Sequence, residues 1–186
     1  MNNASSTIVG APTRYSPLIV TLHWLMALCV LLEAFTGVVF LHFLPNTAVK
    51  ITPLVVHMAL GVVMIVLMIV RVFARVFSAP PVHLTAGHWF LDLVGGFTHF
   101  LLYLFTVLSA LTGAILAIQS RVLQLMIGRP VQLPIQFASL FTHAAVFALF
   151  GLIVGLHILA SLYHQFVRND KIFSRIWYVP RRKART

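Results

Sequence analysis

The stretch FASLFTHAAVFALFGLIVGLHILASLYHQFV, residues 137–167, decides the fold. It contains no Asp, Glu, Lys or Arg, and it exceeds the roughly 20 apolar residues that a helix needs to cross a bilayer. Three histidines lie in it: His164 is close to its end, and His143 and His157 lie deeper inside. An ionisable side chain at this depth is costly unless it is paired or used, so the sequence predicts that both deeper histidines have a function.

The composition extends this prediction to the whole chain. Of its 186 residues 60% are hydrophobic and only 9% are charged, whereas soluble domains average about 25% charged residues. Three further apolar segments, residues 17–41, 54–70 (continuing to 77) and 93–118, are long enough to span a membrane. We therefore predict an all-α membrane protein, a four-helix transmembrane bundle over residues 17–167. A short segment, residues 1–16, precedes the bundle, and a basic tail, residues 168–186, follows it.

The distribution of positive charge predicts the orientation in the bilayer. Four spans place both termini on one side, and ten of the thirteen Lys and Arg residues fall on that side: Arg14, Arg71, Arg75, Arg168, Lys171, Arg175, Arg181, Arg182, Lys183 and Arg185. The other side receives only Lys50, Arg121 and Arg129. The positive-inside rule then predicts that both termini are cytoplasmic. With no soluble domain to present a basic groove, we expect lipid rather than nucleic acid as the partner of this charge.

The intramembrane histidines fall at two depths. His143 and His157 are fourteen residues apart, which is within about 40° of whole helical turns and a rise of about 21 Å. They therefore point the same way from opposite faces of the hydrocarbon core. His57, early in a span that begins outside, matches the depth of His143, and His23, early in a span that begins inside, matches His157.

Two imidazoles that face each other at one depth suit the two axial positions of a haem iron. The chain has no C-x-x-C-H motif, so the sequence predicts two non-covalent b haems, one per level. Gly61 and Gly155, near the proposed ligands, are expected to give the macrocycle room, although glycine also serves close helix packing. Taken singly, each histidine could also be a hydrogen-bonded packing residue. Zinc is disfavoured because acids and thiols are scarce, and a proton relay would not need two matched levels.

Several stretches resemble the bacterial cytochrome b561 family of four-helix inner-membrane proteins that carry two b haems. The resemblance runs from Arg14 almost to the end, through RYSPLIVTLHWLMAL, HMALGVVMIVLMIVRVFARV, PPVHLTAGHWFLDLVGGFTHFLLYLF and THAAVFALFGLIVGLHILASLYHQFVRNDKIFSRIW. It implies haem ligation by the four residues that depth and phase select: His23, His57, His143 and His157. It also implies an inner-membrane location and exchange of electrons with the ubiquinone pool.

Some members of that family resemble superoxide oxidases, which pass electrons from superoxide outside to quinone. The predicted outer side carries three cations, Lys50, Arg121 and Arg129, and no acidic residue. Their positive field would steer an anionic donor towards this side. The alternative is that they are ordinary loop charges. His164 follows His157 by seven residues, and we expect it to contact the quinone or supply a proton; an interfacial histidine is the alternative. Arg71 and Arg75 are candidate partners of the haem propionates, although membrane topology alone would also place them there.

The leading hypothesis is a dihaem superoxide:ubiquinone oxidoreductase. A cytochrome b anchor that transfers electrons for a separate dehydrogenase or hydrogenase is the alternative, and a non-redox haem or proton carrier is a third. The sequence leaves open the donor, the quinone, the oligomeric state and the roles of Glu33 and His99.

Overall fold

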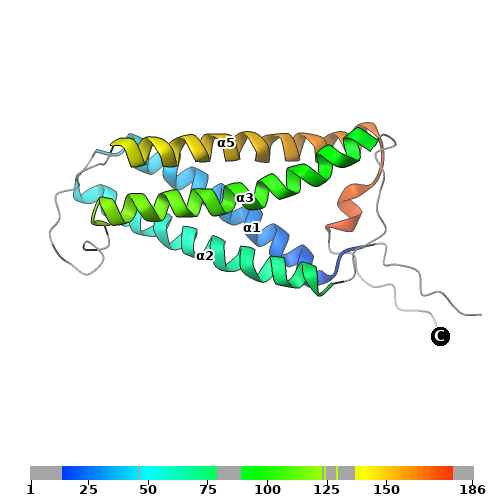
Figure 1. Cartoon of the computed structure of the whole chain (residues 1–186), viewed down its shortest axis with the longest axis horizontal. Helices are drawn as coiled ribbons and strands as arrows, with labels where there is room; N and C mark the ends of the chain where they lie inside the picture. The colour runs from blue at the N-terminus through cyan, green and yellow to red at the C-terminus, as the bar shows by residue number, and fades with distance from the viewer. Residues whose placement is uncertain are drawn as a thin grey trace, which may run out of the picture.

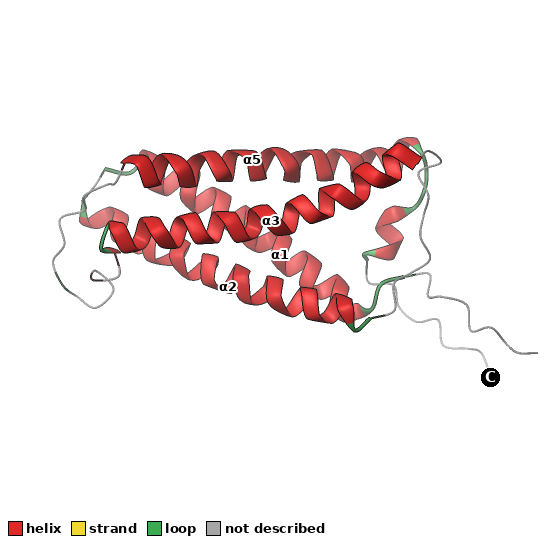
Figure 2. Cartoon of the chain, viewed as in Figure 1, coloured by secondary structure: helices red, strands yellow, loops and turns green. Residues whose placement is uncertain are grey.

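The computed structural model describes residues 14–45, 47–78, 89–122, 124, 129 and 137–177. Four long helices make up most of it: α1 (Pro17–Phe35), α2 (Ile51–Val76), α3 (Trp89–Gln119) and α5 (Phe137–Leu162). They lie lengthwise side by side (Figure 1), and this described part contains no strand (Figure 2). The predicted all-α class is confirmed.

Short irregular helices extend the long ones. A π-helical turn, η1 (Thr36–Leu41), continues α1, and a second one, η3 (Tyr163–Val167), continues α5. Helix α1 begins at Pro17 behind the cap residue Ser16, whose side chain accepts a hydrogen bond from the Ile19 amide at 3.4 Å. Proline fits this first position because it has no amide hydrogen to leave unpaired.

The second span begins earlier than the sequence predicted. A short 3₁₀ turn, η2 (Ala48–Lys50), leads directly into α2 at Ile51, so the apolar helical segment runs over Ala48–Val76. Pro53 does not delay the start, because it lies in the first turn of α2, where the backbone amides have no helical acceptor. The other spans, Pro17–Leu41, Leu93–Gln119 and Ala138–Val167, agree with the prediction to within a residue.

The helices pack mainly as two pairs, α1 along α2 and α3 along α5, with a smaller contact between α2 and α3. Helices α1 and α5, which carry His23 and His157, make few direct backbone contacts. No large side chain in the described part is completely buried.

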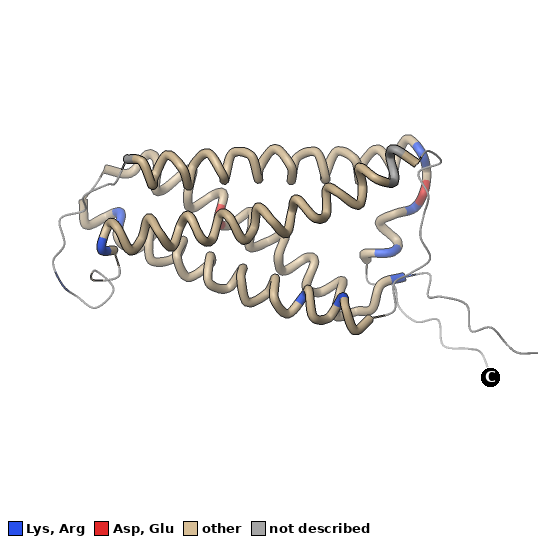
Figure 3. The backbone as a smooth tube through the Cα atoms, in the orientation of Figure 1, with Lys and Arg blue, Asp and Glu red and all other residues tan. Residues whose placement is uncertain are grey.

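The outer surface of the bundle is apolar along its length. Large side chains such as Leu31, Val62, Leu111 and Leu159 are more than half exposed on four different helices, as a lipid-facing surface requires. Figure 3 shows the Lys and Arg residues gathered near the two ends, with most at the end where α1 begins and η3 lies. Arg181, Arg182, Lys183 and Arg185 lie outside the described residues.

Candidate functional site

The structure brings the four predicted ligands together as two pairs. The rings of His57 on α2 and His143 on α5 have their centres 6.2 Å apart, with an interplanar angle of 83°. The rings of His23 on α1 and His157 on α5 are 6.4 Å apart at 69°. Both predicted pairings are therefore observed as contacts across the bundle, while ligation itself stays a prediction.

These separations fit two imidazoles on opposite sides of one iron. A metal–nitrogen bond is about 2 Å, and adding the distance from nitrogen to ring centre on each side gives roughly 6 Å in all. The pairs join helices that otherwise make few backbone contacts. The donor set is what two b haems require.

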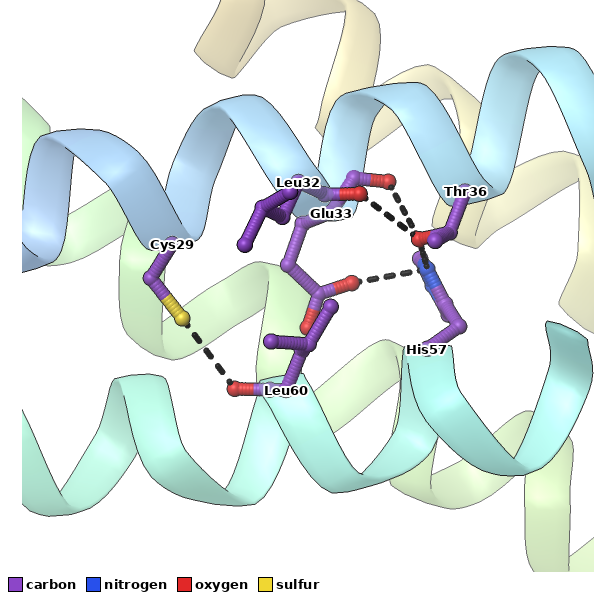
Figure 4. Close-up of polar contacts among 6 residues, drawn as sticks. All are labelled: Cys29, Leu32, Glu33, Thr36, His57 and Leu60. Atoms are coloured by element: carbon purple, nitrogen blue, oxygen red, sulfur yellow. Dashed lines mark hydrogen bonds and ion pairs between the residues drawn. The ribbon is translucent and has the colours of Figure 1, made fainter.

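The ring of His57 is held on its Nδ1 edge by helix α1 (Figure 4). Nδ1 lies 2.7 Å from a carboxylate oxygen of Glu33 and 2.9 Å from the hydroxyl of Thr36. The Thr36 hydroxyl donates to the carbonyl oxygens of Leu32 and Glu33 at 2.8 and 3.1 Å, so towards His57 it acts as the acceptor. Nδ1 of His57 is thus the protonated nitrogen, and Nε2 is left with the lone pair that a metal needs.

His143 is held in the same way by helix α3. Its Nδ1 lies 3.1 Å from the hydroxyl of Thr112, which donates to the carbonyl oxygens of Leu108 and Ser109 at 2.8 and 3.1 Å. The same argument assigns the proton to Nδ1 and the lone pair to Nε2. Both outer histidines are consequently preorganised in the tautomer suited to ligation.

A glycine follows each of these threonines and makes room for the ring. A Cβ on Gly37 would lie 3.3 Å from Cε1 of His57, and one on Gly113 would lie 3.1 Å from Cε1 of His143. The two Thr-Gly dipeptides, residues 36–37 and 112–113, therefore cradle the outer pair. We did not predict these dipeptides from the sequence, although the occurrence of Thr-Gly in two different spans could have pointed to them.

The two glycines singled out from the sequence do not contact the histidines in this structure. Gly61 faces Glu33, whose Oε1 would be 3.3 Å from an added Cβ, and Gly155 faces open space. Proximity in sequence does not fix the direction a helical residue faces, and the expected role of both glycines beside a macrocycle stays a prediction. The outer rings rest on glycines of the neighbouring helices instead.

The inner pair has a third histidine beside it. The ring of His99 on α3 lies 5.3 Å from that of His157, and its Nδ1 is bonded to the carbonyl oxygen of Gly95 at 2.9 Å. Arg71 donates to the carbonyl oxygen of Ile19 at 2.9 Å and is within electrostatic range of all three inner histidines. This arginine therefore ties α2 to the start of α1 and supplies positive charge at the inner level.

Arg75 and His164 make contacts of their own near the same end. The guanidinium of Arg75 lies 6.0 Å from the ring centre of Tyr15, and Nδ1 of His164 pairs with Asp170 at 2.6 Å. The π-helical geometry of η3 begins at Tyr163, so His164 lies at the junction of α5 and this wider turn. The predicted roles of Arg71 and Arg75 at propionates and of His164 at quinone stay predictions.

The three predicted steering charges lie at the opposite end by connectivity. Lys50 immediately precedes α2, and Arg121 and Arg129 lie in the connection after α3; both arginines are exposed. In the described chain, this end holds no acidic side chain.

We predict that Gly113→Val weakens binding of the outer haem selectively. Even a Cβ would press on His143, and the branched side chain adds a strain of about 1–3 kcal/mol. Displacing an oriented ligand typically costs about 10- to 100-fold in affinity. Gly151→Val is the matched control, because a Cβ at Gly151 on α5 meets no atom of the structure. Haem retention during dilution checks the prediction; equal retention in both variants would contradict the cradle.

Comparison with known proteins gives one family. The family model described as prokaryotic cytochrome b561 matches residues 14–178. No match is found among curated proteins or among solved structures.

Proposed function

The chain belongs to the prokaryotic cytochrome b561 family, and from this premise we propose that it takes electrons from superoxide on the outer side and delivers them to ubiquinone near the inner side. Transmembrane electron transfer through b haems is what the family does. The donor, the acceptor, the number of haems and the direction are our proposal.

The main support for this proposal is the presence of two histidine pairs at two levels of the bundle, each with one member on α5. Two bound haems would supply one-electron carriers between the membrane faces. His57 and His143 would hold the outer one, and His23 and His157 the inner one. Along α5 the two ligands are about 21 Å apart, a separation that the conjugated rings would shorten.

At the outer end, positively charged side chains would attract the anionic donor. Superoxide loses one electron and leaves as O₂, so two superoxide ions are consumed for each quinone reduced. Lys50, Arg121 and Arg129 raise the local concentration of the anion without touching it. We place this end outside and both termini in the cytoplasm, on the strength of the ten-to-three division of Lys and Arg.

At the inner end, quinone reduction also consumes two protons. His164 is only partly buried, and its contact with Asp170 fixes the ring near the end of the last span. An imidazole held by a carboxylate at the membrane surface is suited to hydrogen-bond a quinone oxygen and pass on a proton. We assign His164 this role, with Asp170 as its positioning residue.

A stopped-flow experiment with the isolated haem-loaded protein tests the proposal. Superoxide should reduce the haems, and ubiquinone should reoxidise them. In His164→Ala, reduction should be unchanged while reoxidation slows by about 10²-fold or more, the usual contribution of a positioned proton donor. His42→Ala, the same replacement at the end of η1 on the other side of the bundle, is the control.

Two results would decide against this function. Haems that superoxide does not reduce would favour the anchor subunit of a separate dehydrogenase or hydrogenase. A His164→Ala protein that cannot be reduced, but is reoxidised normally, would show that electrons enter at the inner end.

A further inference from the structure

Glu33 is the one acidic residue within the four apolar segments. It lies in α1, with its side chain only 15% exposed, and its Oε1 is buried without a hydrogen-bond partner in the described part of the chain. A carboxyl group at this depth is expensive and marks a function by default. The electron-transfer proposal above does not use it.

The contact that Glu33 makes is with a predicted haem ligand. Its Oε2 lies 2.7 Å from Nδ1 of His57, and the side chain reaches down from α1 to the His57 ring on α2 (Figure 4). Because Thr36 is the second acceptor at this nitrogen, Nδ1–H is shared between a hydroxyl and a carboxylate. A hydrogen bond to an ionised acceptor is shorter and about twice as strong as one between neutral groups.

The facing ligand has the same threonine contact, but no carboxylate is bonded to its Nδ1 in the described residues. The Thr112 hydroxyl contacts Nδ1 of His143, just as the Thr36 hydroxyl contacts Nδ1 of His57. Three residues before Thr36, helix α1 has Glu33. Three residues before Thr112, helix α3 has Ser109. The hydroxyl of Ser109 is itself buried and without a partner in the described residues. The two halves of the outer cradle therefore differ chiefly in this one carboxylate.

We propose that Glu33 is a positioning residue that makes His57 the stronger donor of the two outer axial ligands and lowers the reduction potential of the outer haem. A carboxylate accepting from Nδ1–H raises the basicity of Nε2, and a more basic axial nitrogen stabilises the oxidised iron. The negative charge itself acts in the same direction. The proposal rests on haem ligation by His57 and His143, which the proposed function assumes.

The alternative is that Glu33 only clamps α1 to α2. The same helices are also joined by the Cys29 thiol, 3.6 Å from the carbonyl oxygen of Leu60, and by the Arg71 contact with Ile19. A clamp would affect haem retention and thermal stability but would leave the potential of the bound haem unchanged. The reduction potential therefore separates the two roles.

The test is a redox titration of the purified dihaem protein, followed by absorbance at both haems. Glu33→Gln keeps the size and an acceptor oxygen but removes the charge. The midpoint potential of the outer haem should rise, while that of the inner haem should stay in place. Ser109→Ala, at the matching position of α3, should shift neither potential. His57→Ala identifies the outer haem by its loss.

The outcomes are distinguishable. Unchanged potentials in a Glu33→Gln protein that holds both haems would overturn the proposal, as would equal shifts of both. If Glu33→Gln loses the outer haem, Glu33→Ser, which carries the side chain of the matching Ser109, is titrated instead: it removes the charge, so a raised outer potential supports the proposal and a wild-type value overturns it. If His57→Ala keeps both haems, the ligand assignment itself has failed, whatever Glu33 does.

Discussion

Replacing His143 by alanine should remove the outer haem and leave the inner haem in place. The outer pair is closed by His57 and His143 alone, and alanine offers no nitrogen to the sixth position of the iron. The inner pair, His23 and His157, lies about four helical turns further along α5, so its geometry should survive. Haem content per chain should fall from about two to about one.

The absorbance spectrum and a haem assay on the purified variant measure this effect. Thr142→Ala is the control, because the neighbouring Thr142 is exposed and its hydroxyl bonds only within α5, to the carbonyl oxygen of Ala138. An unchanged haem content in His143→Ala would show that His143 is not a ligand. Loss of both haems together with an intact helical fold would show that the two sites are not independent.

The second large effect should come from the outer cations. Changing Lys50, Arg121 and Arg129 to Gln together should slow haem reduction by superoxide about tenfold at low salt, the lower end of the range for electrostatic steering. Added salt should slow the wild type and hardly affect the variant, because the Debye length falls to about 10 Å at 0.1 M. Reoxidation by ubiquinone should not change.

A matched variant controls for net charge. Arg14 lies just before α1, and Lys171 and Arg175 lie in the segment after η3, which bonds to Tyr15 at the start of α1. Changing all three to Gln removes as much positive charge from the protein. Reduction by superoxide should then proceed at the wild-type rate. If both triple variants were slowed equally, the effect would come from the net charge of the protein and not from local steering by the outer cations.

The parts of the structure that the sequence could predict depend on simple periodicities. Span lengths follow from the thickness of the bilayer, and His143 and His157 share a face because they share one regular helix. His57 and His23 could be paired with them by depth alone, since adjacent spans run in opposite directions. These relations hold however the helices are rotated about their axes.

The surroundings of the histidines depend on how each helix is rotated about its own axis, and the periodicities of the sequence do not determine that rotation. Glu33 reaches His57 only because α1 and α2 pack with these faces together, and Gly37 and Gly113 come under the rings for the same reason. That Gly61 faces Glu33 depends on the same rotation. The π-helical turn that begins one residue before His164 is another local feature that the sequence did not predict.

The central claim is that two histidine pairs hold two b haems at two levels of one bundle. The most direct measurement is the haem-to-protein ratio of the purified wild-type chain, determined as the pyridine haemochrome against quantitative amino-acid analysis. We expect about two haem b per chain, with two separate steps in a redox titration. A ratio of about one in fully loaded protein, with a single redox step, would contradict it.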